Sequence, residues 1–179
     1  LHILDLAQNS VRANAALVEI MVSVDESRLI TITIRDDGSG MSDELKERVT
    51  SPFATTRTTR KVGLGIPLMM QNARLAGGDV RIDSTLGQGT TLTATLHGDS
   101  IDCLPLGDLA GTVVSLVSAN PERPDFRLSC SSPKGSMDFD TREMRQALGN
   151  VPLNEPEITA WMLSAIQEEI EPIFGGVIL

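Results

Sequence analysis

The stretch Asp36-Asp37-Gly38-Ser39-Gly40-Met41 contains two glycines shortly after a carboxylate, and it follows a strand-like run ending at Arg35. An ionised carboxylate only accepts hydrogen bonds, so Asp36 suits the exocyclic amine of a nucleobase. Gly38 and Gly40 carry no Cβ and let the backbone approach a ligand closely. Taken alone, the stretch is equally typical of an ordinary turn between a strand and a helix. Its interpretation therefore depends on the other motifs in the chain.

A second glycine pair, Gly63 and Gly65, precedes a predicted helix and follows three cations, Arg57, Arg60 and Lys61. Free N–H groups, a favourable helix dipole and nearby cations together favour phosphate binding. The spacing is not that of a dinucleotide fingerprint, and no Walker A sequence occurs. A flexible loop entering a helix is the structural alternative.

Asp5 and Asn9 stand four residues apart in a predicted helix over residues 1–16, so both project from one side of it. The carbonyl oxygen of Asn9 is a suitable ligand for Mg²⁺, a hard cation that prefers oxygen. A solvated polar stripe is the alternative. An acceptor for a base amine, an oxygen for a metal ion and a phosphate cradle are complementary parts of one nucleotide site.

Two periodicities predict the elements that position these residues. Apolar residues alternate in two hairpins, and they recur at helical spacing in the segments between them. Helices packed on one face of an antiparallel or mixed sheet follow from that order. The predicted series is a helix (1–16), strands (17–24 and 29–35), a short helix capped by Ser42, a polar basic loop (51–62), a helix ending at Ala76, and strands (79–84 and 90–96).

Residues 98–179 differ in character from residues 1–97, and we treat them as a separate acidic α/β extension of unknown role. Residues 1–97 hold 11 acids and 10 bases, whereas residues 98–179 hold 13 acids and 5 bases. We expect the Trp161-bearing helix to pack on the uncovered face of the sheet, or alternatively to dock a partner. The predicted elements are helices at 109–119, 141–148 (capped by Thr141) and 157–170, and a hairpin of strands 125–130 and 136–140.

The composition excludes several classes of protein. The chain has 179 residues, of which 41% are hydrophobic and 22% charged, as in globular proteins. A net charge of −9 without a basic stripe argues against nucleic acid as a partner. The sequence contains no apolar run of membrane-spanning length and no signal peptide, and free thiols are the default for Cys103 and Cys130. We expect a cytoplasmic protein; a homodimer is compatible with the sequence.

The order of the motifs resembles the GHKL ATPase superfamily, which includes gyrase B, heat-shock chaperone ATPases, MutL and histidine kinases. The resemblance covers residues 1–97. Within the superfamily, these residues look most like the histidine-kinase ATP-binding catalytic domain, because Pro52-Phe53 precedes a short lid and a Gly-Leu-Gly-Ile sequence. The matching motifs are Asp5-Leu6-Ala7-Gln8-Asn9-Ser10-Val11-Arg12-Ala13, Asp36-Asp37-Gly38-Ser39-Gly40-Met41, Ser51-Pro52-Phe53 with the Thr/Arg run after it, Gly63-Leu64-Gly65-Ile66 and Gly87-Gln88-Gly89-Thr90-Thr91.

The resemblance implies a Bergerat fold, an α/β (α+β) two-layer sandwich that binds ATP and Mg²⁺ between helices and a lid. Asp36 would accept from the adenine amine, Asn9 would bind Mg²⁺, and Thr90 or Thr91 would hold a water molecule beside the base. Asp5 stands where hydrolases of the superfamily carry a glutamate base, but its side chain is one methylene shorter. The remaining implied ATP contacts are Gly38, Gly40, Met41, Phe53, Arg57, Arg60, Lys61, Gly63, Leu64, Gly65, Ile66, Gly87 and Gly89.

The resemblance implies a phosphotransferase of histidine-kinase type, which would pass the γ-phosphate to a histidine, serine or threonine on another segment or protein. His2 lies on the first helix and His97 ends a strand, and neither has a phosphoacceptor motif around it. A nucleotide-dependent binding module similar to anti-sigma factors is an alternative, in which the extension binds a regulatory protein. A slow ATPase that uses Asp5 is a third hypothesis.

Overall fold

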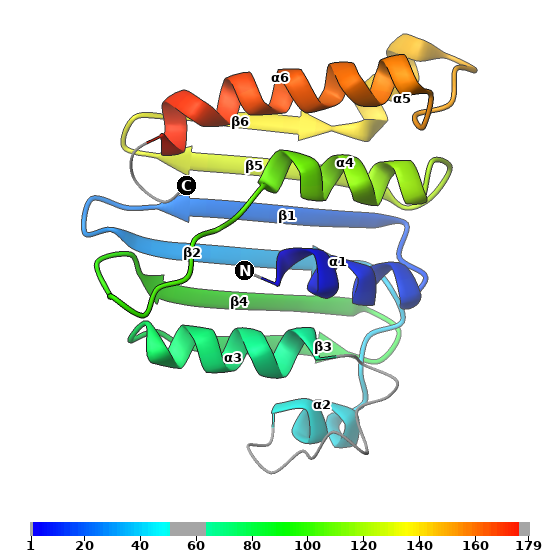
Figure 1. Cartoon of the computed structure of the whole chain (residues 1–179). Coiled ribbons are helices and arrows are strands. Elements are labelled where there is room, and N and C mark those ends of the chain that lie inside the picture. The colour runs from blue at the N-terminus through cyan, green and yellow to red at the C-terminus, as the bar shows by residue number, and fades with distance from the viewer. Residues whose placement is uncertain (1, 51–63, 176–179) are drawn as a thin grey trace.

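The computed structural model describes residues 2–50 and 64–175, and it contains one six-stranded mixed sheet (Figure 1). The strand order is β3-β4-β2-β1-β5-β6. Only β1 and β5 pair in parallel; the other neighbours are antiparallel. The strands are β1 (Leu17–Val24), β2 (Leu29–Asp36), β3 (Val80–Thr85), β4 (Gly89–His97), β5 (Asp125–Ser132) and β6 (Gly135–Asp140).

Alternating side chains give the sheet one apolar face and one polar face. In the central register Val22 lies opposite Ile32, and Ile34 lies opposite Leu92, with all four side chains buried. Successive strand residues point to opposite faces, so the intervening positions, such as Thr33, belong to the other face. The hydrophobic core therefore lies on a single side of the sheet.

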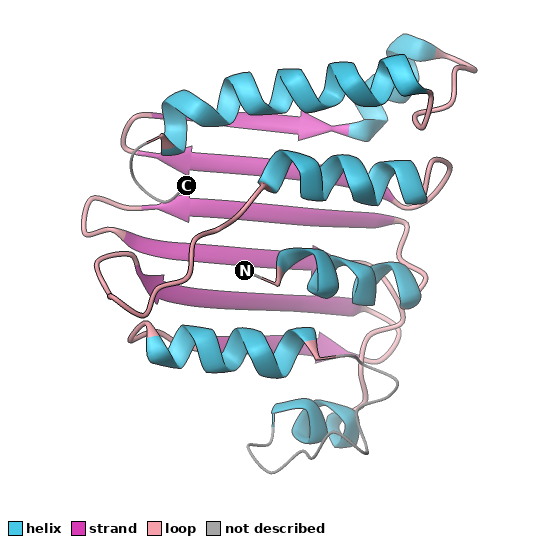
Figure 2. Ribbon diagram, viewed as in Figure 1, coloured by secondary structure: helices cyan, strands magenta, loops and turns pink. Residues whose placement is uncertain are grey.

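Helices cover that apolar face as one layer (Figures 1 and 2). The prediction of a two-layer sandwich with helices on one face is confirmed. The first helix is shorter than the sequence predicts, because Asn14 adopts a positive φ of 58° and ends it before β1. The helices are α1 (Ile3–Arg12), α2 (Asp43–Thr50), α3 (Gly65–Leu75), α4 (Leu109–Ala119), α5 (Thr141–Leu148) and α6 (Pro156–Phe174).

The C-terminal extension continues the same sheet. Strand β5 pairs with β1 in the register Val18–Phe126 and Ile20–Leu128, and these four side chains are buried together. Helix α4 packs on α1, and α6 packs on α4 and the last two strands. The expectation that the Trp161-bearing helix covers the bare face is wrong: α6 joins the existing helical layer, and Trp161 is 58% exposed.

The cap of α5 also differs from the prediction. Asp140 is the N-cap residue, and its side chain accepts a hydrogen bond from the Arg142 N–H at 2.9 Å. Thr141 is fully buried instead, where its hydroxyl accepts from the Phe126 N–H and donates to Asp125. Aspartate and threonine are both favoured at the N-cap position, and here Asp140, one residue before Thr141, occupies it.

Candidate functional site

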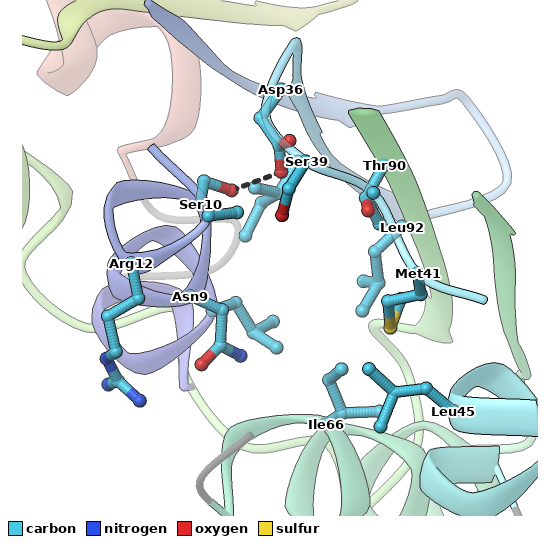
Figure 3. Close-up of a pocket in the computed structure, with 14 residues that line it drawn as sticks. Asn9, Ser10, Arg12, Asp36, Ser39, Met41, Leu45, Ile66, Thr90 and Leu92 are labelled. Atoms are coloured by element: carbon cyan, nitrogen blue, oxygen red, sulfur yellow. Dashed lines mark hydrogen bonds between the residues drawn. The ribbon is translucent and has the colours of Figure 1, made fainter. Parts of the chain in front are cut away.

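A pocket of about 210 Å³ opens between α1, the end of β2, β4 and the start of α3 (Figure 3). Polar side chains of α1 lie on one side of it, and apolar side chains lie on the other. Such a mixture suits a flat apolar ring that carries a few polar groups. The lining residues are Leu6, Asn9, Ser10, Arg12, Ala13, Ile34, Asp36, Ser39, Gly40, Met41, Leu45, Ile66, Thr90 and Leu92.

The carboxylate of Asp36 is held in orientation by two hydrogen bonds. Ser10 Oγ donates to Oδ2 at 2.6 Å, and the Gly38 N–H donates to Oδ1 at 2.9 Å. Each oxygen thus receives one donor from the protein and keeps a further lone pair for a ligand. The Ser10 contact joins α1 to the end of β2 across the pocket (Figure 3).

The glycines after Asp36 are required by neighbouring backbone. A Cβ on Gly40, whose φ is +64°, would lie 2.0 Å from the carbonyl oxygen of Thr85. A Cβ on Gly38 would lie 2.7 Å from the carbonyl oxygen of Ala13. The structure therefore gives these glycines a packing role, in addition to the ligand approach that the sequence predicts.

Asp37 stabilises the turn behind the pocket. Its Oδ1 accepts hydrogen bonds from the N–H groups of Ala16 at 2.7 Å and Leu17 at 3.0 Å. Partial burial acts to raise the pKa of Asp37, but the backbone N–H groups of Leu17 and Ala16 outweigh it and hold the pKa below the ordinary value of 3.8. Asp37 thus serves the scaffold, whereas its neighbour Asp36 faces the pocket.

Ser84 connects the two glycine-containing loops, a role that the sequence analysis missed. Its hydroxyl accepts from the Met41 N–H at 2.8 Å and lies 3.0 Å from the Gly89 carbonyl oxygen and 2.8 Å from Thr90 Oγ1. Ser84 is a buried polar residue in β3. An apolar-facing serine in a strand is a signal that could have identified it.

Asn9 lines the pocket, and its Nδ2 is buried without a hydrogen-bond partner among residues 2–50 and 64–175. Buried polar atoms in native proteins normally have a partner, so this N–H donor is suited to a ligand that brings an acceptor. Asp5 is placed differently. Its side chain is 54% exposed, lies 3.5 Å from His2 Nδ1 and is absent from the pocket lining.

The start of α3 contributes Ile66 to the pocket, whereas Leu64 is exposed and Gly65 packs against α1. A Cβ on Gly65 would lie 2.9 Å from the Cβ of Asp5. This glycine therefore allows the two helices to approach closely. Among the described residues of this motif, only Ile66 lines the pocket.

The β3–β4 turn brings two more predicted residues to the site. A Cβ on Gly89 would lie 2.0 Å from the Asp36 carbonyl oxygen, while Gly87 has open space around it. Thr90 lines the pocket, but Thr91 does not, because strand alternation turns it to the opposite face of the sheet. The alternation of Thr90, Leu92 and Ala94 could have shown this from the sequence.

Several predicted contacts lie outside the described residues, namely Phe53, Arg57, Arg60, Lys61 and Gly63. The structure adds pocket residues to which the sequence motifs assigned no ligand contact. Ser10 and Arg12 are close to Asn9 in sequence, and Ser39 lies between the two glycines, so their positions were available as a signal. The apolar additions are Leu6, Ala13, Ile34, Leu45 and Leu92.

The described ranges contain neither a metal-binding cluster nor a membrane-spanning helix. No group of three or more His, Cys, Asp or Glu side chains in residues 2–50 and 64–175 could hold a metal ion. Within the same ranges, no helix has the length and apolar character needed to cross a membrane.

Known proteins are similar to this chain over its first half. Residues 2–100 match the family model described as histidine kinase-, DNA gyrase B-, and HSP90-like ATPase. An uncharacterized sensor-like histidine kinase of Rhizobium meliloti is 33% identical over 45% of this chain and 17% of its own length. Sensor histidine kinase WalK of Bacillus subtilis is 35% identical over 40% of this chain and 13% of its own length. The matches thus span less than a fifth of either relative.

Among solved structures, the histidine kinase domain of the Erythrobacter litoralis EL346 blue-light activated histidine kinase is 19% identical, with a TM-score of 0.34 over 45% of this chain and 31% of that one. The family model covers more than half of the 179 residues. The chain therefore belongs to the family of histidine kinase-, DNA gyrase B- and HSP90-like ATPases.

Proposed function

We propose that this chain is an ATP-binding catalytic domain of histidine-kinase type, which supplies the γ-phosphoryl group of ATP to an acceptor on another segment or another protein. The family match and the sensor kinases among its relatives support the class of activity. ATP, the proposed donor, is a cytoplasmic metabolite, and we place the domain in that compartment.

The observation that carries the proposal is the oriented carboxylate of Asp36 in a largely apolar pocket. A carboxylate accepts from the adenine amine, and Ser10 and Gly38 hold it in one orientation before the ligand arrives. The side chains of Ile34, Met41 and Leu92 offer apolar surface to the ring. Together they distinguish adenine from bases without an amine at that position.

The residues present fit a magnesium ion that comes with the nucleotide. Asn9 lines the pocket, and its amide oxygen would be the protein ligand, since the described residues contain no group of three or more His, Cys, Asp or Glu that could hold a metal ion. Mg²⁺ commonly uses few protein ligands and completes its shell with phosphate oxygens and water. When bound, the ion neutralises charge on the phosphates during transfer.

The proposal gives Asp5 no role as a base. Its carboxylate is half exposed and outside the pocket lining, whereas proton transfer requires reach of about 3 Å or one intervening water. Positioning and charge neutralisation are sufficient for phosphoryl transfer to a protein acceptor. A partner phosphoacceptor is thus the expected second component.

Asp36→Asn tests the adenine contact. The substitution replaces one carboxylate oxygen with an NH2 donor and removes the charge. We therefore expect the affinity for Mg·ATP to fall roughly 10- to 150-fold, which corresponds to the loss of a hydrogen bond to a charged group. Isothermal titration calorimetry on the folded variant measures it. Asp43→Asn, at an exposed aspartate of α2, is the matched control and should bind like wild type. Wild-type affinity in Asp36→Asn would contradict the adenine assignment.

A nucleotide-dependent binding module is a second candidate, favoured by the acidic extension beyond the family match and its exposed Trp161. Incubation with γ-labelled ATP and candidate acceptors separates the two. Label on an acceptor supports the kinase proposal. ATP-dependent binding of a regulator without transfer supports the module.

A further inference from the structure

The turn from Ala13 to Ala16, which joins α1 to β1, lies directly behind the pocket. On the pocket side, the Ser39 N–H donates to the Ala13 carbonyl oxygen at 2.9 Å. The Ala16 N–H donates to Asp37 Oδ1 at 2.7 Å. The loop that follows Asp36 therefore rests on this turn.

The extension contacts the other side of the same turn. Arg123 Nε donates to the Ala15 carbonyl oxygen at 3.2 Å, and Nη2 donates to the Asn14 carbonyl oxygen at 3.3 Å. The Asp125 N–H donates to the Ala16 carbonyl oxygen at 2.9 Å. All four carbonyl groups of the turn thus have partners, three of them from residues beyond the family match.

The turn and its contacts gather at one end of the sheet. The end of β2, the start of β5 and the α1–β1 connection lie together at the right of Figure 1, and the β5–β6 turn lies at the opposite end. Ser10, on the last turn of α1 before this connection, is the residue that donates to Asp36. Displacing the turn would therefore disturb both donors of Asp36, Ser10 and Gly38.

We propose that Arg123, contributed by the C-terminal extension, is a positioning residue for the nucleotide site, because it fixes the α1–β1 turn against which the loop of Gly38 and Ser39 packs. The inference rests on the proposed ATP binding. Gly38 packs closely on the Ala13 carbonyl oxygen, so a shift of the α1–β1 turn would also shift the loop of Gly38 and Ser39. The planar fork of arginine reaches two carbonyls at once, which a lysine ammonium does only poorly.

The test uses the full chain in four forms: wild type, Arg123→Ala, Arg123→Lys and Lys134→Ala. Lys134→Ala is the matched control, since it removes one cation from the extension at the far end of the sheet, where Lys134 Nζ donates to the Gly175 carbonyl. Calorimetric Kd for Mg·ATP, thermal midpoint and ¹⁵N amide shifts of Gly38 and Ser39 without nucleotide are measured on each, at a temperature where all are folded.

We expect Arg123→Ala to bind Mg·ATP roughly 2- to 30-fold more weakly, the range of coupling through a packed network. The Gly38 and Ser39 amide resonances should move in the nucleotide-free protein, Arg123→Lys should recover part of the affinity, and Lys134→Ala should match wild type. A lower thermal midpoint with unchanged Kd and unchanged amide shifts would mean that Arg123 only stabilises the fold, and would overturn the inference.

The two proposals fail separately. If wild type does not bind Mg·ATP, the proposed function is wrong, while the amide shifts still report whether Arg123 positions the loop. If wild type binds and Arg123→Ala binds equally well with the loop resonances in place, only the positioning role is wrong.

Discussion

At the scale of single residues, two adjacent carboxylates have opposite tasks. Asp36 presents its oxygens to the pocket, with one protein donor on each. Asp37 accepts two backbone N–H groups and faces the α1–β1 turn. Because neighbouring side chains at the end of a strand point in different directions, one aspartate can bind while the next supports the loop.

The lowered pKa of Asp37 predicts a pH-dependent contribution to stability. Asp37→Ala removes the acceptor of two N–H groups, so we expect the free energy of unfolding at neutral pH to fall by roughly 1 kcal/mol, a modest value because water can replace the carboxylate there. Asp37→Asn keeps an acceptor oxygen and should lose less. Urea denaturation of the three proteins measures these differences.

The sign of the pH effect follows from the direction of the shift. Folding lowers the pKa of Asp37 below 3.8, so its stabilisation is complete above that value and is lost as the pH falls through the lower folded pKa. The stability gap between wild type and Asp37→Ala should thus persist at mildly acidic pH and close only below 3.8. A gap that closes well above this pH would show that another group is responsible.

At the scale of elements, the pocket depends on two turns that only glycine fits. The loop after β2 and the β3–β4 turn pack against each other, with Gly40 against Thr85 and Gly89 against Asp36. Ser84 links the same two segments through its hydroxyl. The glycine motifs therefore maintain the pocket wall through backbone contacts, in addition to any contact with ligand.

Gly40→Ala and Gly87→Ala separate steric conflict from backbone strain. Both glycines have positive φ, so each alanine should cost roughly 1–2 kcal/mol of unfolding free energy from conformation alone. Only the Gly40 Cβ meets backbone, at 2.0 Å from the Thr85 carbonyl oxygen, whereas nothing lies within 4 Å of the Gly87 Cβ.

We expect Gly40→Ala to lose at least roughly 3 kcal/mol or to fail to fold, because the backbone of β3 must move as well. Gly87→Ala should remain folded with only the conformational cost. Chemical denaturation followed by circular dichroism compares them. Equal losses in the two variants would contradict the packing role of Gly40.

At the scale of the whole molecule, the extension completes the sheet that the family motifs begin. Strand β5 occupies the edge of β1, and its Phe126 and Leu128 share the core with Val18 and Ile20. Helix α4 lies beside α1 in the helical layer that covers this sheet. The proposed division after residue 97 thus cuts through one sheet and one core.

Removing residues 98–179 tests whether residues 1–97 fold alone. The fragment would expose the backbone edge of β1 and lose the helix that packs on α1, so we expect it to lack a cooperative unfolding transition and to bind a hydrophobic dye. Near-ultraviolet circular dichroism and dye fluorescence report this against the intact chain. A cooperative transition in the fragment would instead support an independent domain of residues 1–97.

Much of the architecture could be predicted from local pattern. Alternating apolar residues identified the strands of the first two hairpins, and helical spacing identified α1, α3 and α6. The glycine motifs located five of the described pocket residues besides Asn9: Asp36, Gly40, Met41, Ile66 and Thr90. Local patterns succeed here because strand and helix periods are set by the chain itself.

The placement of Asp5 and Trp161 required the assembled structure. Asp5 and Asn9 share a side of α1, yet the Asp5 side chain is 54% exposed, whereas the Asn9 amide nitrogen is buried at the pocket. The sequence likewise could not decide which side of the sheet α6 covers, because that depends on the pairing of β5 with β1. Burial depends on segments distant in sequence.

The sequence by itself determined the motif order, the helices and strands, and Asp36 as the acceptor to place at the centre of a nucleotide site. Only the tertiary structure decided that Ser10 and Gly38 orient this carboxylate, and that Arg123, 87 residues after Asp36 in the printed sequence, supports the turn behind it. Periodicity is written into neighbouring residues, whereas hydrogen bonds between distant segments exist only once the chain has brought them together.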